Sequence, residues 1–331
     1  MKLQRLGSTD LRVSAMGVGM AALGRPGYIN IGHGDDLERN YHVADMERRA
    51  HNVLDAAWNR GVRYFDAARS YGRAEAFLGS WLRDRGDLAD TVVIGSKWGY
   101  TYKADWQVAA HAHEVKDHSL PVLRRQWAES LATLGRRPDL YQIHSATLES
   151  GVLENTPVLG ELARIKGDGV VIGLSVSGPR QREVIERALS LKVDGIGLFD
   201  CVQATWNLLE RSAEPALALA AGKGVGVIVK EGLANGRLTE RNISPEFEPK
   251  LASLNRIARR LETSVDALAL AAVLARPWAG VVLSGAACVE HLASNLTAVE
   301  TVLDDAAVSA LEELTELPET YWQIRSKLAW N

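Results

Sequence analysis

The chain is poor in the residues that build disulfide frameworks and zinc sites. Only 2 of its 331 residues are cysteines, Cys201 and Cys288, and both lie in apolar, strand-like segments. We interpret them as reduced core thiols, which are typical of a reducing compartment. No Cys/His spacing of the zinc type occurs, so we predict no metal site. A chain of this length can bury a large core without such cross-links.

Long apolar runs and an excess of one charge are missing too. No window approaches the ~18 apolar residues of a membrane span, and MKLQRLGSTDLRVS lacks the apolar centre of a signal peptide. The formal net charge is −3, and no basic stripe suits nucleic acid. We therefore expect a cytoplasmic protein without membrane or nucleic-acid partners. The sequence leaves open whether it is a monomer or a homo-oligomer.

What the chain does contain is a regular alternation of two kinds of segment. Short apolar runs predict strands at Ala15–Met20, Val62–Ala67, Thr91–Lys97, Leu140–His144, Val170–Val176, Gly195–Ala204, Val225–Lys230 and Gly280–Gly285. Amphipathic stretches predict helices at Met46–Asn59, Ala74–Arg85, Val122–Leu134, Glu161–Ile165, Gln181–Leu191, Glu214–Ala221, Lys250–Ala275 and Val289–Val302. Such alternation is typical of βαβ units with parallel strands.

Eight such units favour an α/β fold of the (β/α)8 TIM-barrel class over an open sheet. An open dinucleotide-binding sheet needs a Gly-x-Gly-x-x-Gly turn after an early strand, and MGVGMAALGRPG lacks that spacing. Ahead of the barrel, Leu3–Leu6 and Leu11–Val13 flank a Gly-Ser-Thr-Asp turn, which predicts an N-terminal β-hairpin that closes one barrel end. No linker-like segment divides the chain, so we expect a single domain over residues 1–331.

Four polar residues fall at or just after the ends of three consecutive predicted strands. Asp66 ends the second strand and Tyr71 follows it in the loop. Lys97 ends the third strand and His144 ends the fourth. Neighbouring strand ends meet at the mouth of a barrel, where barrel enzymes carry their active sites. We therefore expect the four side chains to converge.

This combination suits the transfer of a hydride to a carbonyl, or the reverse. A tyrosine with an ordinary pKa of about 10 is a poor acid, but a nearby ammonium favours its phenolate and a carboxylate holds that ammonium in place. The histidine can donate a hydrogen bond to the carbonyl oxygen and stabilise its developing charge. A lone lysine or histidine at a strand end is more often structural, so the prediction depends on the conjunction of all four.

The segment GVRYFDAARSYGRAEAFLG resembles a signature of the aldo-keto reductases, Gly-Val-x-x-Phe-Asp-x-Ala-x-x-Tyr-Gly-x-x-Glu. Lys97 and His144 match that family in order, spacing and strand context, and RLGSTDLRVSAMGVG matches its hairpin and first strand. The resemblance covers essentially the whole chain and is nearest to the aldose/galactose dehydrogenase branch. It implies an NAD(P)(H)-dependent reductase or dehydrogenase acting on a small carbonyl or alcohol. Tyr71 would be the general acid/base, tuned by Lys97 and Asp66, with His144 orienting the substrate.

The same resemblance implies where the cofactor binds. The implied contacts are Ser175, Gln203 and Trp206 at the nicotinamide, Lys230, Gly232, Leu233 and Gly236 at the pyrophosphate, and Ser284, Gly285, Glu290, His291 and Asn295 at the adenosine. Trp206 would stack on the nicotinamide ring. Ala287 stands where NADP-selective members carry a cation for the 2′-phosphate. We rank NADP(H) first because the family favours it, with NAD(H) or dual use as the alternative.

Several points stay open at this stage. Lys230 could pair with Glu231 or reach a phosphate. We interpret the histidine-rich run at His111, His113 and His118 as a solvated loop. One alternative function is a cofactor-binding regulatory subunit with little turnover, against which the complete tetrad argues. A metal-dependent barrel hydrolase or isomerase would need more ligands at the strand ends than the sequence offers.

Overall fold

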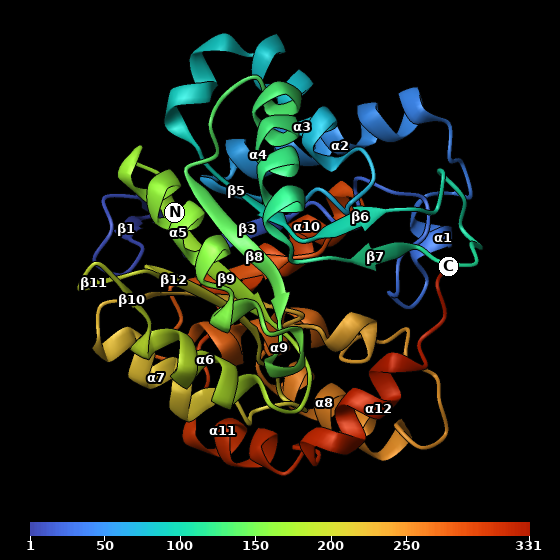
Figure 1. Ribbon diagram of the computed structural model, residues 1–331. Helices are drawn as coiled ribbons and strands as arrows, with labels where there is room; N and C mark the ends of the chain where they lie inside the picture. Colours follow the sequence, from blue (N-terminus) through green and yellow to red (C-terminus); the bar gives the residue numbers. More distant parts are fainter.

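The computed structural model describes residues 1–331 apart from the side chains of residues 87–89. Eight parallel strands of the described chain close into a barrel in chain order, with the last strand pairing with the first (Figure 1). They are β3 (Met16–Gly19), β4 (Tyr64–Asp66), β5 (Val93–Trp98), β8 (Leu140–Ala146), β9 (Val171–Val176), β12 (Cys201–Thr205), β13 (Gly226–Lys230) and β14 (Val281–Ser284). The predicted (β/α)8 barrel is confirmed.

Helices alternate with these strands and cover the outside of the barrel (Figure 1). They are α2 (Val43–Asn59), α3 (Ala74–Asp84), α4 (Leu120–Leu134), α5 (Thr156–Gly167), α6 (Gln181–Ser190), α7 (Glu214–Gly222), α9 (Val265–Leu274) and α10 (Val289–Leu296). Additional helices are α1 (His33–Asp36), α8 (Glu248–Arg260), α11 (Asp305–Glu312) and α12 (Pro318–Ser326). Within the part of the chain that the structure describes, no helix is both long and apolar enough to cross a membrane.

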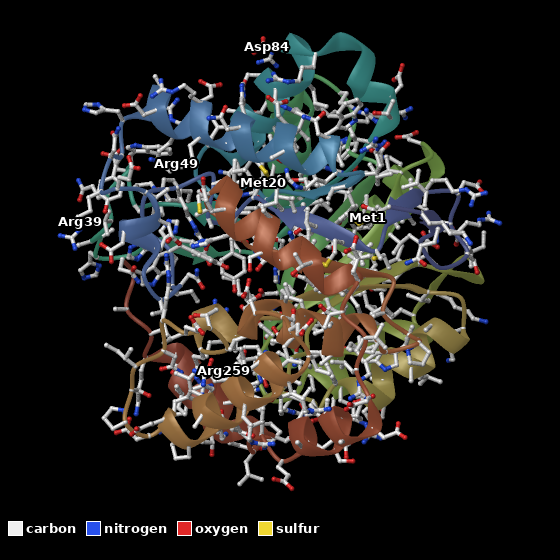
Figure 2. The ribbon with its side chains drawn as sticks, turned by 180° about the vertical axis from the view of Figure 1, so that it is seen from behind. Met1, Met20, Arg39, Arg49, Asp84 and Arg259 are labelled. Atoms are coloured by element: carbon white, nitrogen blue, oxygen red, sulfur yellow. The ribbon has the colours of Figure 1, made fainter. Side chains whose placement is uncertain are left out.

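Helix α2 shows how the outer layer is held in place. Its buried residues include Met46, Ala50, Val53 and Ala57, and this spacing of three or four places them on one face. The exposed residues of α2 include Arg48, which lies between the charged residues Glu47 and Arg49, whereas α9 is buried on nearly all sides. In the view from behind, Asp84 lies at the outer end of α3, whereas Met20, which follows β3, is fully buried (Figure 2). Burial of one apolar face therefore fixes α2 against the barrel.

The N-terminal hairpin is present and closes one end of the barrel. Strand β1 (Leu3–Arg5) pairs with β2 (Arg12–Ser14) in antiparallel register. The fully buried side chain of Leu6 packs against the start of β13, where a Cβ on Gly226 would lie 2.6 Å from Leu6 Cγ. A larger residue at position 226 would therefore displace the hairpin.

The structure corrects two predicted elements. The predicted strand Gly195–Ala204 is divided: β10 (Lys192–Val193) and β11 (Ile196–Gly197) form a small hairpin, and the barrel strand begins at Cys201. Asp194 and Gly195 both have positive φ, as an Asp-Gly hairpin turn requires. The predicted helix Lys250–Ala275 is two helices, because Glu262 has a positive φ and Ser264 caps α9 by accepting a hydrogen bond from the amide of Ala267.

Two smaller interpretations hold only in part. A solvated loop is correct for His111, which is exposed and lies between β6 (Tyr100–Tyr102) and its partner strand β7 (Glu114–Lys116), but wrong for His118, which is buried. Cys201 is a buried thiol as expected, but Cys288 is only half-buried and precedes α10 rather than lying in a strand. The β6–β7 hairpin stands above the carboxyl ends of the barrel strands, where it helps to form the site described next.

Candidate active site

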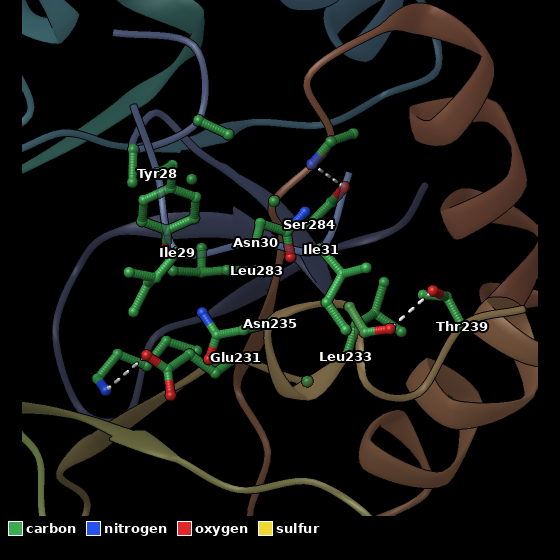
Figure 3. Close-up of a pocket in the computed structure, with 18 of the residues that line it drawn as sticks. Tyr28, Ile29, Asn30, Ile31, Glu231, Leu233, Asn235, Thr239, Leu283 and Ser284 are labelled. Carbon is green, nitrogen blue, oxygen red and sulfur yellow. Dashed lines mark hydrogen bonds and ion pairs between the residues drawn. The ribbon is translucent and has the colours of Figure 1, made fainter. Parts of the chain in front are cut away.

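A cavity of about 660 Å³ opens at the carboxyl ends of the barrel strands. Residues 28–31 of the loop after β3 form one wall, and residues 231–239 of the loop after β13 face them (Figure 3). Tyr71 and His144 line one part of the cavity, and His291 and Asn295 of α10 line another. This size is within the range of ligand sites in proteins, about 300–1,000 Å³.

Asp66 forms the polar floor beneath Tyr71. Its Oδ2 atom is in ion-pair contact with the ammonium of Lys97, a residue with no solvent exposure. Its Oδ1 atom accepts hydrogen bonds from the side chains of Tyr64 (2.8 Å), Gln203 (3.1 Å) and Gln142 (3.3 Å). Lys97 also donates to the carbonyl oxygen of Ala67 at 3.0 Å. The buried pair is therefore hydrogen-bonded on both sides, as buried charges must be.

Tyr71 and His144 meet directly above this floor. The Tyr71 hydroxyl lies 3.4 Å from His144 Nε2, and Ser70 Oγ lies 3.3 Å from His144 Nδ1. A Ser70 hydroxyl that donates to Nδ1 leaves the ring proton on Nε2, the nitrogen that faces Tyr71. Lys97 Nζ is 5.1 Å from the centre of the Tyr71 ring. One carbonyl oxygen could therefore receive hydrogen bonds from both the phenol and the imidazole.

Burial sets the protonation of both groups. It raises the pKa of Tyr71 above the ordinary value, and Asp66 raises it further, so the phenol keeps its proton. This direction is opposite to the one expected from Lys97 alone, because burial, and after it the Asp66 carboxylate, favour the neutral phenol. Burial also lowers the pKa of His144 well below 6.5, with Lys97 and Arg25 acting in the same direction. The pair is thus a neutral phenol beside a neutral imidazole.

Most residues expected at the cofactor line this cavity. They are Gln203, Lys230, Gly232, Leu233, Gly236, Ser284, Gly285, His291 and Asn295. Asn295 Nδ2 donates to Ser284 Oγ at 2.8 Å, which ties α10 to the end of β14. In the described chain, the amides of Gly232 and Leu233 donate to no backbone carbonyl. Free amides on a glycine-containing loop are suited to an anion such as a phosphate.

Three expected cofactor residues lie elsewhere. Trp206 is fully buried and packs edge-on against Trp278, with ring centres 5.5 Å apart, so it presents no face to the cavity. It immediately follows β12, and the guanidinium of Arg276 lies over its ring at 4.9 Å. Ser175 is fully buried and does not line the cavity. Its Oγ atom accepts a hydrogen bond of 2.8 Å from the amide of Ser145. Glu290 is an exposed residue in the first turn of α10.

The two open questions about the loop after β13 have structural answers. Lys230 Nζ donates to Thr205 Oγ1 at 2.7 Å and lies 3.8 Å from Glu231 Oε1, so its pairing with Glu231 is long. Glu231 instead binds Arg325 of α12, whose Nε lies 2.9 and 3.1 Å from the two carboxylate oxygens. Burial lowers the pKa of Lys230 to about 8. Lys230 therefore retains donors that face the cavity.

Sequence reasoning missed Arg25, which lies in the loop after β3. Its side chain is 4 % exposed, and its guanidinium carbon lies 5.2 Å from the Tyr71 ring centre and 4.8 Å from that of Trp330. Its NH1 group donates to Glu114 of β7 at 3.1 Å. The sequence around it, Gly-Arg-Pro-Gly, contains no signal for such a position. Only the fold brings this loop beside Tyr71.

The last residues of the chain complete the wall next to Arg25. Trp330 stacks on His113 with ring centres 3.7 Å apart, and Asn331 exchanges backbone hydrogen bonds with Tyr28 at 3.1 and 3.2 Å. In Figure 1 the C-terminal segment runs from α12 to a point near α1 and β7. Among the described side chains, no three His, Cys, Asp or Glu residues gather closely enough to hold a metal ion.

Comparison with known proteins gives a consistent result. The sequence model described as "Aldo/keto reductase family" matches residues 17–316. A protein of Escherichia coli (strain K12) named NADH-specific methylglyoxal reductase is 26 % identical over 96 % of this chain and 100 % of its own length. A D-threo-aldose 1-dehydrogenase of a Pseudomonas species is 28 % identical over 71 % of this chain and 72 % of its own length.

Among solved structures, the holo form of an aldo-keto reductase from Bacillus halodurans superimposes with a TM-score of 0.73. It is 22 % identical in sequence, and the match covers 96 % of this chain and 97 % of that one. At this identity the likeness supports the fold.

Proposed function

Because the chain belongs to the aldo/keto reductase family, an oxidoreductase family acting on carbonyls and alcohols, we propose that Tyr71, His144, Lys97 and Asp66 are its catalytic groups. The observation that carries the proposal is the 3.4 Å approach of the Tyr71 hydroxyl to His144 Nε2 inside the cavity. Two neutral donors that converge on one point are what a carbonyl oxygen requires as it gains negative charge.

The reaction follows from the protonation states. A nicotinamide cofactor, when bound, supplies the hydride for reduction or accepts it in oxidation. In the reductive direction, His144 donates a hydrogen bond to the carbonyl oxygen and holds it in place. Tyr71 then gives its proton to the same oxygen, which completes the alcohol. In the oxidative direction Tyr71 first releases its proton to solvent and its phenolate then accepts the proton of the alcohol, while the Asp66–Lys97 pair keeps the side chain in position.

The cavity residues support a dinucleotide as the cofactor. Gly232 and Leu233 offer free amides to a phosphate, and Lys230 adds a cation beside them. A Cβ added to Gly285 would meet no atom within 4 Å, so this part of the wall is open space into which a ligand can fit. His291 and Asn295 would lie at the adenosine, whereas the buried Trp206 has no part in the proposal. The named E. coli relative uses NADH, and either dinucleotide is compatible with these contacts.

We also propose that residues 1–331 act as one catalytic domain. The first and last barrel strands, β3 and β14, pair with each other, and the C-terminal residues return to the cavity. The substrate would be a small aldehyde, ketone or sugar, since Trp330 and Tyr28 supply apolar walls near Tyr71.

The test is to titrate NADH and NADPH while following tryptophan fluorescence, and then to assay a panel of aldehydes, ketones, sugars and alcohols. Binding of at least one dinucleotide together with turnover of a carbonyl or alcohol is expected. Tight binding without turnover on any compound would favour a cofactor-binding regulatory protein. A lack of binding by both dinucleotides would contradict the assignment of the cavity.

A further inference from the structure

One charged cluster in the cavity has no part in the reaction described above. Asp36 of α1, Arg241 of the loop after β13 and His291 of α10 come from three distant segments and meet at the wall that also contains Asn295. Arg241 NH1 is in ion-pair contact with Asp36, and Arg241 NH2 lies 3.2 Å from His291 Nε2. His291 Nδ1 lies 3.7 Å from the Asp36 carboxylate.

Asp36 is the unusual member of this cluster. Its side chain is only 2 % exposed and borders the cavity. Arg241 contacts its Oδ1 atom, whereas its Oδ2 atom has His291 Nδ1 at 3.7 Å, beyond hydrogen-bond distance. Burial raises the pKa of this carboxyl above its usual value, although His291 and Arg241 lower it. A buried carboxylate with one oxygen beyond the reach of a donor is stabilised by a ligand that donates a hydrogen bond to it.

The charges that surround Asp36 decide which ligand that is. Arg241 and His291 are the cationic partners of Asp36, and Glu240 and Asp266 are further carboxylates in the lining of the same cavity. Arg241 is already engaged by Asp36 and donates to the carbonyl oxygen of Gly32 at 3.2 Å. A phosphate placed here would be repelled by the Asp36 carboxylate and would have to compete with it for Arg241.

We infer that Asp36 selects NAD(H) over NADP(H) by accepting hydrogen bonds from ribose hydroxyls and opposing a 2′-phosphate. The inference rests on the proposed function, because it takes the part of the cavity beside α10 as the adenosine end. A carboxylate that binds ribose hydroxyls, against an arginine that accommodates a phosphate, is the usual distinction between the two dinucleotides. Here the arginine is present but is held by the carboxylate. This reverses the order expected from the sequence, in which NADP(H) comes first.

The experiment compares the dissociation constants of NADH and NADPH, measured by quenching of tryptophan fluorescence and independently by calorimetry. The wild type is expected to bind NADH at least about tenfold more tightly, since the Asp36 carboxylate repels the 2′-phosphate of NADPH. In Asp36→Asn, Arg241 is released and the repulsion is removed. The dissociation constant of NADPH should therefore fall relative to that of NADH by about tenfold or more, mainly because NADPH binds more tightly.

Asp35→Asn is the matched control. Asp35 is the preceding residue of α1, its side chain is 70 % exposed, and it pairs with Arg39 outside the cavity. The Asp35→Asn variant should leave the ratio of the NADH and NADPH dissociation constants unchanged. Arg241→Gln is a second variant with the opposite prediction: NADPH binds more weakly than in the wild type, because Asp36 loses its counter-charge, while NADH is little affected.

Two results would overturn the inference: a wild type that prefers NADPH, or an Asp36→Asn variant with an unchanged ratio. Because the readout is binding, it does not depend on turnover. A protein that shows the expected ratio but reduces no carbonyl would contradict the proposed activity and leave the selection by Asp36 intact. A protein that binds neither dinucleotide would overturn both.

Discussion

Arg325 and Glu231, 94 residues apart in the chain, form an ion pair in which both carboxylate oxygens contact the guanidinium. Glu231 is 8 % exposed and Arg325 is 24 % exposed. The pair joins α12 to the loop that carries the free amides of Gly232 and Leu233. The C-terminal helix therefore helps to hold the proposed phosphate-binding loop.

Loss of the guanidinium should destabilise the protein. Arg325→Gln leaves Glu231 buried without its partner, which costs about 3 kcal/mol of the free energy of unfolding, the lower end for breaking a buried pair. Chemical denaturation followed by circular dichroism measures this. Arg325→Lys keeps the charge but cannot contact both oxygens in the same geometry, so an intermediate loss is expected. Equal stability of the wild type and both variants would show that the pair contributes nothing.

The same pair predicts a pH dependence of stability. The pKa of Glu231 falls from 4.5 to about 2, because Arg325 and Lys230 together outweigh the effect of burial, which raises it. A carboxylate whose pKa is lower in the folded state contributes stability that is complete above the unfolded value and is lost as the pH falls. The difference in unfolding free energy between the wild type and Glu231→Gln should be constant above about pH 5 and shrink toward about pH 3. A difference independent of pH would contradict this.

Removing the phenol hydroxyl should abolish the chemistry but not cofactor binding. Tyr71→Phe retains the ring and loses the proton, so kcat should fall by about 10²- to 10⁴-fold. The dissociation constant of the dinucleotide should be nearly unchanged. Tyr100→Phe is the control, because that ring lies 4.9 Å from the His144 ring centre without approaching Tyr71. Full activity in Tyr71→Phe would exclude Tyr71 as the acid.

His144 should remain neutral throughout the physiological range. Burial, Lys97 and Arg25 each lower its pKa well below 6.5. A histidine with a lowered pKa gains its proton only when the pH falls below the range in which exposed histidines titrate, so its ring should carry no charge between about pH 6 and 8. Histidine ring signals in nuclear magnetic resonance spectra, assigned with a His144→Gln variant, measure this. A titration of the His144 signal near neutral pH would contradict the neutral imidazole.

The barrel and the convergence of the tetrad could be predicted because both depend on local patterns. Apolar runs mark the strands, and parallel strands bring their carboxyl ends to one mouth, so Asp66 and His144 had to lie close together. The division of Gly195–Ala204 could also have been predicted, since Asp194-Gly195 is a strong hairpin signal. The prediction failed because the largely apolar segments 196–199 and 201–204, which follow this turn, read as one strand.

Other parts of the site could not be read from the sequence. Asp36 lies in the short helix α1, Arg241 in a loop and Arg325 in the C-terminal helix. The positions of these segments depend on packing, and the partners of the three residues are distant in the chain. Trp206 shows a related limit. The side chain of a residue that directly follows a strand can point into the barrel mouth or away from it. The apolar pattern of the strand does not determine which of the two directions it takes.

The pairing of β3 with β14 has a consequence for how the protein is made. Residues 16–19 find their second neighbour only in residues 281–284. During synthesis on the ribosome, the growing sheet therefore keeps two unpaired edges until most of the polypeptide has emerged, and open edges of this kind invite aggregation. We expect nascent chains that stop before residue 281 to depend on chaperones, and production at low temperature to favour recovery of the complete enzyme.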